Sequence, residues 1–323
     1  MDDNLSHRGD LGRAGLNADF TQAVPSDPVE IVILPTLSAA TAGGGSVAVN
    51  PPAGAWSSNG TAVVTATPAP GWTFLHWLGD ATGTNPVATL DMSRHRCAQA
   101  VFGTAFSHTV VGSGSVARSP AAELYPYGTT VRLTALPQAG NYFALWGNAA
   151  SGTNNPLAFT VTNANPTVTA VFAALPGGRH SLAVRTPSPA TVEISPRANH
   201  YASGASVTLS AVPVPGQTFL GWGGPVVSTA NPLTVTMDAS KVITANFTPP
   251  SRLAVFTCGG ALNTANVPLQ LSGEFGGVFV IEASADLQSW SPLATVTNVF
   301  GTVQWNDTTG GAWRFYRAVE SEP

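Results

Sequence analysis

The chain is a succession of short runs in which apolar and polar residues alternate, separated by glycine, proline and asparagine. In the stretch 204–211, Val207, Leu209 and Ala211 alternate with Thr208 and Ser210. This is the period-two pattern of a strand with one buried face. With 33 glycines and 26 prolines but no short period, the pattern predicts an all-β protein of many strands and turns.

One such run belongs to a unit that occurs three times. The segments "ATPAPGWTFLHW", "ALPQAGNYFALW" and "AVPVPGQTFLGW" place Ala, Pro, Gly, Phe and Trp at the same offsets. Self-similarity of this kind indicates tandem repeats of one small module. The shared positions are Ala66, Ala135 and Ala211; Pro68, Pro137 and Pro213; Gly71, Gly140 and Gly216; Phe74, Phe143 and Phe219; and Trp77, Trp146 and Trp222.

The shared pattern extends on both sides of these segments. A glycine opens a turn before each strand, and an Asn-Pro pair and an Ala-x-Phe segment come after each tryptophan. Asn-Pro is typical of a turn, and proline ends a strand because it donates no ladder hydrogen bond. These flanking positions are Gly60, Gly128 and Gly204; Asn85-Pro86, Asn155-Pro156 and Asn231-Pro232; and Phe102, Phe172 and Phe247.

The Phe-x-x-Trp spacing fits neither strand alternation nor a long helix. We expect a β-bulge or a single helical turn that brings both rings into one core. Because each module is small, replacing such a tryptophan by alanine is expected to cost about 3–5 kcal/mol. The predicted repeat core consists of Phe74, Trp77, Phe102, Phe143, Trp146, Phe172, Phe219, Trp222 and Phe247.

Taken together, the Gly-x-x-Phe-x-x-Trp segment, the preceding strand, Asn-Pro and Ala-x-Phe resemble the divergent internalin B-type repeat. The resemblance covers residues 30–248 or so. It implies a compact β-grasp-like or β-sandwich module, found in tandem in large secreted and surface proteins of bacteria, where it acts as a spacer or adhesive element.

The repeat pattern stops after "TPPS" (248–251), and the remaining chain reads as further short strands. Phe279, Ile281 and Ala283 alternate with Val278 and Val280, which predicts an antiparallel immunoglobulin- or fibronectin III-like sandwich. It resembles a β-module that often ends large secreted bacterial repeat proteins. We therefore expect an elongated chain with a flexible leader (1–28), module 1 (29–103), module 2 (104–174), module 3 (175–248) and module 4 (249–323).

Charge is sparse, since only 9% of the residues are charged, there is a single lysine and the net charge is −4. No basic cluster indicates binding of nucleic acid, and no apolar run is long enough for a membrane span. Residues 1–28 do not read as a signal peptide. Because Cys97 and Cys258 fall in different modules, we expect small core residues or free thiols rather than a disulfide.

Few residues are candidates for catalysis or metal binding. Asp80 comes shortly after the first tryptophan, but the matching loops carry no acid, so we expect a solvated turn residue rather than a calcium ligand. His95 and Cys97 lie two residues apart, which is too few ligands for a metal site. No nucleophile motif is present. We therefore expect no catalytic, cofactor-binding or metal-binding residues.

Several aromatic residues lie outside the shared positions: Trp56, Trp72, Tyr125, Tyr142, Tyr201, Trp290, Trp305 and Trp313. Trp72 and Tyr142 lie one and two residues after the shared glycine, and the third copy has Gln217 directly after that glycine. We consider these two as candidate ligand-contact residues, because aromatic rings on β-modules stack on sugars or anchor protein partners. The alternative is partial burial beside the shared phenylalanine.

The leading functional hypothesis is a non-catalytic extracellular or cell-surface protein that serves as a rod-like spacer or adhesive module for a glycan or protein ligand. One alternative is an accessory segment of a larger secreted polysaccharide-active enzyme, with carbohydrate binding as its candidate role. Another is a subunit of a self-assembling extracellular filament that associates through strand edges. The run 29–34, "VEIVIL", is a candidate donor strand for such assembly.

Overall fold

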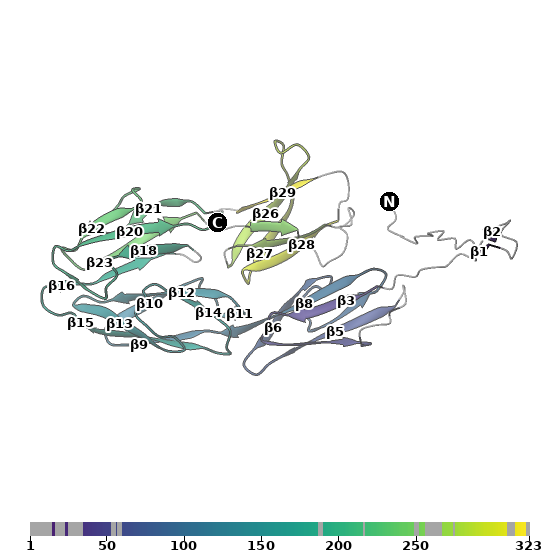
Figure 1. Cartoon of the computed structure of the whole chain (residues 1–323), viewed down its shortest axis with the longest axis horizontal. Coiled ribbons are helices and arrows are strands. Elements are labelled where there is room, and N and C mark those ends of the chain that lie inside the picture. The colour runs from purple at the N-terminus through teal and green to yellow at the C-terminus, as the bar shows by residue number, and fades with distance from the viewer. Residues whose placement is uncertain are drawn as a thin grey trace.

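The described part of the protein is built from strands, turns and bends, as the alternating pattern predicts (Figure 1). The computed structural model describes residues 15–16, 23–24, 35–52, 56, 60–186, 190–215, 217–248, 252–255, 267–273, 275–308 and 314–320. The expected leader and the candidate donor strand 29–34 lie outside these residues, except for the paired strands β1 (Gly15–Leu16) and β2 (Ala23–Val24). No helix long and apolar enough to cross a membrane occurs in the described ranges.

Each repeat is a sandwich of two small sheets with the same strand connections. In one sheet an early strand of the module pairs in parallel with the last strand, which also pairs antiparallel with the strand that carries the shared phenylalanine and tryptophan. The other sheet is an antiparallel set of three. Module 1 contains β3 (Leu37–Thr41), β4 (Gly45–Asn50), β5 (Thr61–Pro68), β6 (Thr73–Gly79), β7 (Val87–Asp91) and β8 (Arg96–Ala105).

Modules 2 and 3 repeat this plan and add short strands at their junctions. Module 2 contains β9 (Ser107–Val111), β10 (Gly114–Ser119), β11 (Leu124–Pro126), β12 (Thr130–Pro137), β13 (Asn141–Asn148), β14 (Leu157–Thr160) and β15 (Thr167–Ala174). Module 3 contains β16 (Arg179–His180), β17 (Leu182–Arg185), β18 (Thr191–Ser195), β19 (Tyr201–Ala202), β20 (Ser206–Val212), β21 (Phe219–Gly223), β22 (Leu233–Thr236) and β23 (Lys241–Phe247).

Module 4 is also a pair of three-stranded antiparallel sheets, ordered β24-β25-β28 and β27-β26-β29. Phe279 and Ile281 are buried and alternate with half-buried neighbours, as the sequence pattern predicts. The more specific immunoglobulin or fibronectin III assignment stays a prediction. The strands are β24 (Arg252–Val255), β25 (Val267–Ser272), β26 (Gly277–Ser284), β27 (Ser291–Asn298), β28 (Thr302–Asp307) and β29 (Phe315–Glu320).

The Phe-x-x-Trp spacing is explained by a β-bulge. The pairing register shifts directly after the phenylalanine in all three copies, between Phe74 and His76, between Phe143 and Leu145, and between Phe219 and Gly221. One extra residue at this point turns the tryptophan to the same face as the phenylalanine. The bulge, and not a helical turn, is therefore what brings both rings into one core.

The connection between modules differs at the two junctions. β8 runs without a break from module 1 into module 2, where its last residues pair with β11. In the second junction, Phe172 and His180 are eight residues apart, whereas the matching Phe102 and Thr104 are two apart. The six extra residues form a turn in which the Arg179 N–H donates to the Pro176 carbonyl at 3.2 Å. They account for most of the longer second repeat period.

This turn folds the chain back on itself. Modules 3 and 4 run alongside modules 2 and 1, so the outline is elongated but two modules wide (Figure 1). The rod-like arrangement that we expected from stacked repeats is therefore wrong for this chain.

Module 4 contacts module 1 through two side chains. The Gln304 side chain accepts a hydrogen bond from the Gly79 N–H at 2.6 Å and donates one to the Gly79 carbonyl at 2.9 Å. The ring of Phe300 stacks on His76.

Candidate functional site

The three shared tryptophans occupy matching sites in the three cores. Trp77, Trp146 and Trp222 are 3%, 1% and 2% exposed. Each indole N–H donates to the carbonyl oxygen eight residues further on, at 2.7–2.9 Å. Each ring lies 4.7–5.3 Å, between centroids, from the shared phenylalanine. The indole N–H groups and the rings of these tryptophans thus make their contacts within the modules, so the tryptophan side chains are not available to a ligand.

The other residues of the predicted repeat core surround these tryptophans. Phe74 and Phe219 are partly buried against the cores of modules 1 and 3, and the rest are buried. The closing phenylalanines pack so closely on glycines that a Cβ on Gly114 would lie 2.4 Å from Cζ of Phe172. The buried members are Phe102, Phe143, Phe172 and Phe247, together with the three tryptophans.

Trp72 and Tyr142, the candidate ligand-contact residues, are half-buried at the junctions between modules. The Trp72 ring lies 5.5 Å from that of Tyr127 in module 2, and the Tyr142 ring lies 4.9 Å from that of His200 in module 3. In the third copy Gln217, which matches Trp72 and Asn141, donates a side-chain hydrogen bond to the Thr248 carbonyl after that module. The two residues between the shared glycine and the shared phenylalanine therefore include one that contacts the next part of the chain in each copy, and a role of Trp72 and Tyr142 in ligand contact stays a prediction.

A further shared aromatic position was missed by the sequence comparison. Trp56, Tyr125 and Tyr201 each lie five residues after a proline and are all buried. The hydroxyl groups of Tyr125 and Tyr201 donate to the carbonyl of that proline, at 2.8 and 3.0 Å, and each accepts from a backbone N–H. The spacing from proline is the signal that identifies this position.

The acidic and sulfur-containing candidates of module 1 are structural. The Asp80 carboxylate accepts from Arg94, from Arg96 and from the Cys97 N–H, so our expectation of a solvated turn residue is wrong. Cys97 forms a disulfide, which corrects the expectation of a free thiol or a simple core residue. Cys258 lies outside the described residues, and within those residues no group of three potential metal-ligating side chains occurs.

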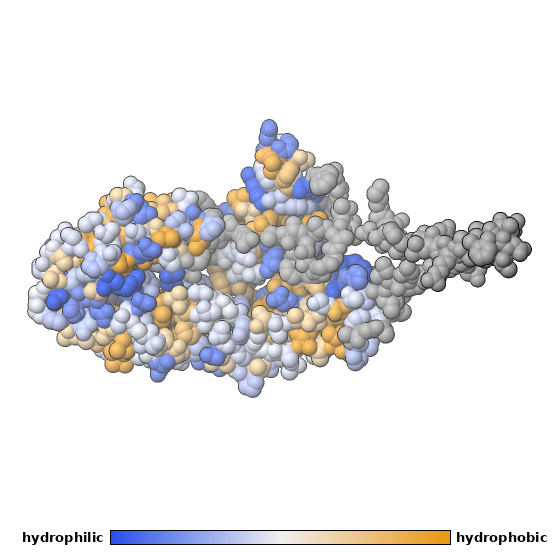
Figure 2. Space-filling model, in the orientation of Figure 1, coloured by the Kyte–Doolittle hydropathy of each residue, from blue (hydrophilic) through white to orange (hydrophobic). Residues whose placement is uncertain are grey.

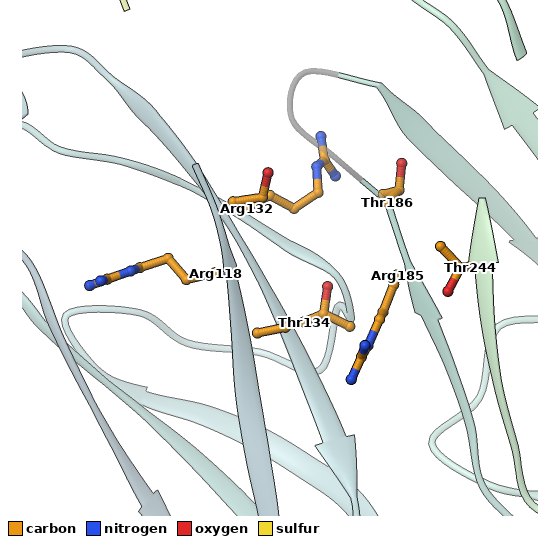
Figure 3. Close-up of a pocket in the computed structure, with 8 residues that line it drawn as sticks. Arg118, Arg132, Thr134, Arg185, Thr186 and Thr244 are labelled. Atoms are coloured by element: carbon orange, nitrogen blue, oxygen red, sulfur yellow. The ribbon is translucent and has the colours of Figure 1, made fainter. Parts of the chain in front are cut away.

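A pocket of about 190 Å³ lies between modules 2 and 3 (Figure 3). Among the described residues, those that line it include three arginines and several threonines but no acidic side chain. One wall of the pocket is formed by strand β12. Its residues Val131 to Leu136 are all buried, whereas residues of the matching strands β5 and β20 alternate between buried and more exposed. Both faces of β12 are covered because module 3 packs β17 against its outer face. The main lining residues are Arg118, Arg132 and Thr134 from module 2 and Arg185, Thr186 and Thr244 from module 3.

The three arginines of this pocket have different roles. The Arg118 side chain points away from the gap, where its Nη1 donates to the Phe106 carbonyl and its guanidinium lies over the ring of Tyr125 (Figure 3). Arg132 is only 6% exposed, and this burial lowers the pKa of its guanidinium from the ordinary value because desolvation disfavours the charged form. Arg185 is exposed at the end of β17.

The three repeats match a known protein family. Three successive stretches, residues 35–105, 106–176 and 181–251, match the family described as the Divergent InlB B-repeat domain. No curated protein matches the chain. The matched stretches coincide with the three sandwiches built around Trp77, Trp146 and Trp222, so the chain belongs to the Divergent InlB B-repeat family and carries three tandem copies of its domain.

Proposed function

We propose that this protein is a non-catalytic extracellular or cell-surface protein. Its modules act as a spacer of fixed geometry and contribute to adhesion. The observation that carries the proposal is the way the modules are joined. β8 crosses from module 1 into module 2 as one strand, and module 4 binds back onto module 1 through Gln304 and Gly79. Rigid joints of this kind suit a spacer, which must keep its ends at a set distance.

The polar groups of module 4 support a structural role. The buried carboxylate of Asp307 is held within the module, where it accepts from Arg314 and from the Tyr316 hydroxyl. Burial, the hydrogen bond to Asp307 and the Asp307 charge together raise the pKa of Tyr316 to about 12. Such a tyrosine stays protonated at neutral pH, and it serves as a hydrogen-bond donor rather than as a base.

The surface also fits an extracellular spacer. On the face shown in Figure 2, strongly hydrophilic residues form small separate groups among weakly polar and apolar ones. This distribution follows from a composition with 9% charged residues. A surface with few charges does not by itself attract nucleic acid or an anionic membrane, which favours recognition by local contacts.

The experiment that tests the location is labelling of intact cells of the source organism with an antibody raised against module 2. Labelling without permeabilisation supports the proposal, and labelling only after lysis would refute it. The adhesive role is tested by a binding screen of the full chain against glycans and host proteins, with Trp72→Ala and Tyr142→Ala as variants. Because both side chains lie at junctions, each variant is also checked for an unchanged scattering profile.

Self-association is a second candidate function, favoured by one edge strand. β9 is the outer strand of the sheet β13-β15-β9, and all five of its residues are exposed, including Val110 and Val111 at 39% and 55%. An open edge with apolar side chains is suited to pairing with another strand. Sedimentation of the purified chain tests this, since Val111→Lys should convert any oligomer to monomer, while a wild type that stays monomeric at all concentrations would exclude it.

A further inference from the structure

The contact between modules 2 and 3 joins one strand of the repeat to one face of it. Module 3 packs β17, the outer strand of the sheet β17-β23-β21, against the outer face of β12, the central strand of β10-β12-β14. Residues on both sides are buried, since Ala183 of β17 is 2% exposed and Arg132 and Thr134 of β12 are 6% and 3% exposed. Because the modules share one plan of strands, each has a counterpart of both surfaces.

The counterpart of β17 in module 2 is left open. It is β9, because both strands pair in parallel with the closing strand of their module. With the closing Ala-x-Phe aligned, Ser107 takes the place of Ala183, but Ser107 is exposed. All five residues of β9 are exposed, and Figure 1 shows the strand on the side of module 2 that faces away from module 3. Module 2 therefore presents, uncovered, the strand that module 3 uses in its contact.

The counterpart of the β12 face is left open in module 3. It belongs to β20, the central strand of β18-β20-β22. Counted from the shared alanine of the two strands, Ser210 takes the place of Thr134 and Val212 that of Leu136. Val212 is 40% exposed, whereas Leu136 is 8% exposed. The face extends onto β18 through exposed Glu193, which pairs with Ser210. Module 3 therefore presents the face that module 2 uses in its contact.

The open surfaces lack the charges that the existing contact contains. Arg132 and Arg185 line one pocket between modules 2 and 3, and like charges in a partly desolvated space repel. Their counterparts on the open surfaces are Thr208 of β20 and Thr109 of β9. A contact between β9 and β20 would therefore bring together mainly serine, threonine and valine side chains, and burial of the valines favours it.

We propose that β9 of one molecule packs on the outer face of β20 in module 3 of a second molecule, as β17 packs on β12 within the chain. The two surfaces differ, so the contact is heterologous, and a molecule that receives a β9 on module 3 still offers its own β9. Such a contact continues head to tail into a linear assembly. The inference deepens self-association, the second candidate function, rests on it, and names the surface that receives β9.

The strength of the contact follows from the way modules 2 and 3 are connected. A short connection holds two modules at an effective concentration of about millimolar order. Separate molecules lack this advantage, so we expect weak association in dilute solution and assembly where the protein is crowded. Sedimentation of the full chain up to about 1 mM should show a weight-average mass that rises with concentration beyond that of a dimer.

Two variants test the two surfaces separately. Ser107→Lys changes β9 where the counterpart Ala183 is buried, and Ser210→Lys changes β20 where the counterpart Thr134 is buried. Each should weaken the association by about tenfold or more, because the contact would bury an unpaired ammonium group. Ser151→Lys is the matched control, since Ser151 is exposed beside Gly152, which bridges to β13 at the opposite edge of the sheet from β9. It should associate within about twofold of the wild type.

A mixture of the two variants tests the head-to-tail arrangement. The Ser107→Lys molecule keeps an intact β20 face, and the Ser210→Lys molecule keeps an intact β9. An equal mixture should therefore form dimers and nothing larger, at concentrations at which each variant alone is monomeric. Circular dichroism of each variant confirms that the modules remain folded.

Three results would overturn the proposal. A wild type that stays monomeric up to about 1 mM excludes this contact and self-association together, and it leaves the spacer role standing. Wild-type association by Ser210→Lys excludes β20 as the receiving surface, while self-association through β9 stands. A mixture of the two variants that forms no dimer excludes the head-to-tail arrangement.

Discussion

Replacing Trp146 by alanine tests the central feature of each module, which is a core organised around one indole. Trp146 is 1% exposed, its ring packs on Phe143, and its N–H donates to the Asn154 carbonyl at 2.7 Å. An aromatic side chain of this size buries about 150–250 Å². At ~25 cal/mol per Å² this contributes about 4–6 kcal/mol, and alanine retains a part of it.

Measured large-to-small replacements in cores support a loss of about 3–5 kcal/mol for such a change. The matched stretch of module 2 runs from residue 106 to 176, and a domain of that length has a free energy of unfolding of about 4–11 kcal/mol. The variant therefore removes a large share of the stability of module 2. We expect module 2 to unfold before its neighbours rather than with them.

The assay is urea denaturation followed by circular dichroism, combined with hydrogen exchange read by mass spectrometry for each module. Trp146→Phe keeps most of the ring but leaves the Asn154 carbonyl without its donor, which should cost about 1–3 kcal/mol. Leu145→Ala is the control, because Leu145 is the adjacent residue, is 44% exposed and should cost less than about 1 kcal/mol. A Trp146→Ala loss no larger than that of Leu145→Ala, or loss of protection in module 1 or 3 instead, would refute the reasoning.

Three further predictions concern individual contacts. Asn155→Ala removes a side chain that bonds both the N–H and the carbonyl of Ala135, and should lower the free energy of unfolding of module 2 by about 1–3 kcal/mol. Gln304→Ala removes both bonds to Gly79 and should speed hydrogen exchange at the Gly79 amide. Burial lowers the pKa of His76 from 6.5, so the unfolded chain binds a proton more readily than the folded one. Stability should therefore fall as the pH drops below about 6.5 and should not change above it for this group.

Each of these has a control within the chain. Asn85→Ala alters the first Asn-Pro pair, where the asparagine side chain is exposed and bonds the Val87 N–H two residues away, so it should cost less than Asn155→Ala. Gln304→Glu keeps the acceptor and loses the donor, and should speed exchange less than Gln304→Ala. His76→Phe should reduce the acid-induced loss of stability between pH ~6.5 and ~5, above the range in which most carboxylates titrate. Part of the loss should remain, because burial also lowers the pKa of His108. Unchanged acid sensitivity in His76→Phe would show that another group is responsible.

The sequence was sufficient for the features that each module makes within itself. Strand alternation, the turns at glycine and Asn-Pro and the Phe–Trp core all depend on residues close together in one copy, and threefold repetition makes their spacing visible. For the Phe-x-x-Trp segment the sequence left a bulge and a helical turn as alternatives, and the pairing register decided for the bulge. Local patterns of this kind predict structure because the same short-range sterics and burial act in every copy. The position of Trp56, Tyr125 and Tyr201 was equally local, but a change of residue type in the first copy hid it.

Only the tertiary structure decided how the modules meet. Arg132 and Arg185 lie 53 residues apart and share a pocket because six extra residues before β16 turn module 3 back onto module 2. The Cys97 disulfide and the contact of Gln304 with Gly79 likewise join segments that no local pattern relates. The repeat pattern in the sequence identifies the strands and the core of each module. The orientation of one module relative to the next depends instead on the backbone dihedral angles of a short connection, and packing between the modules sets those angles.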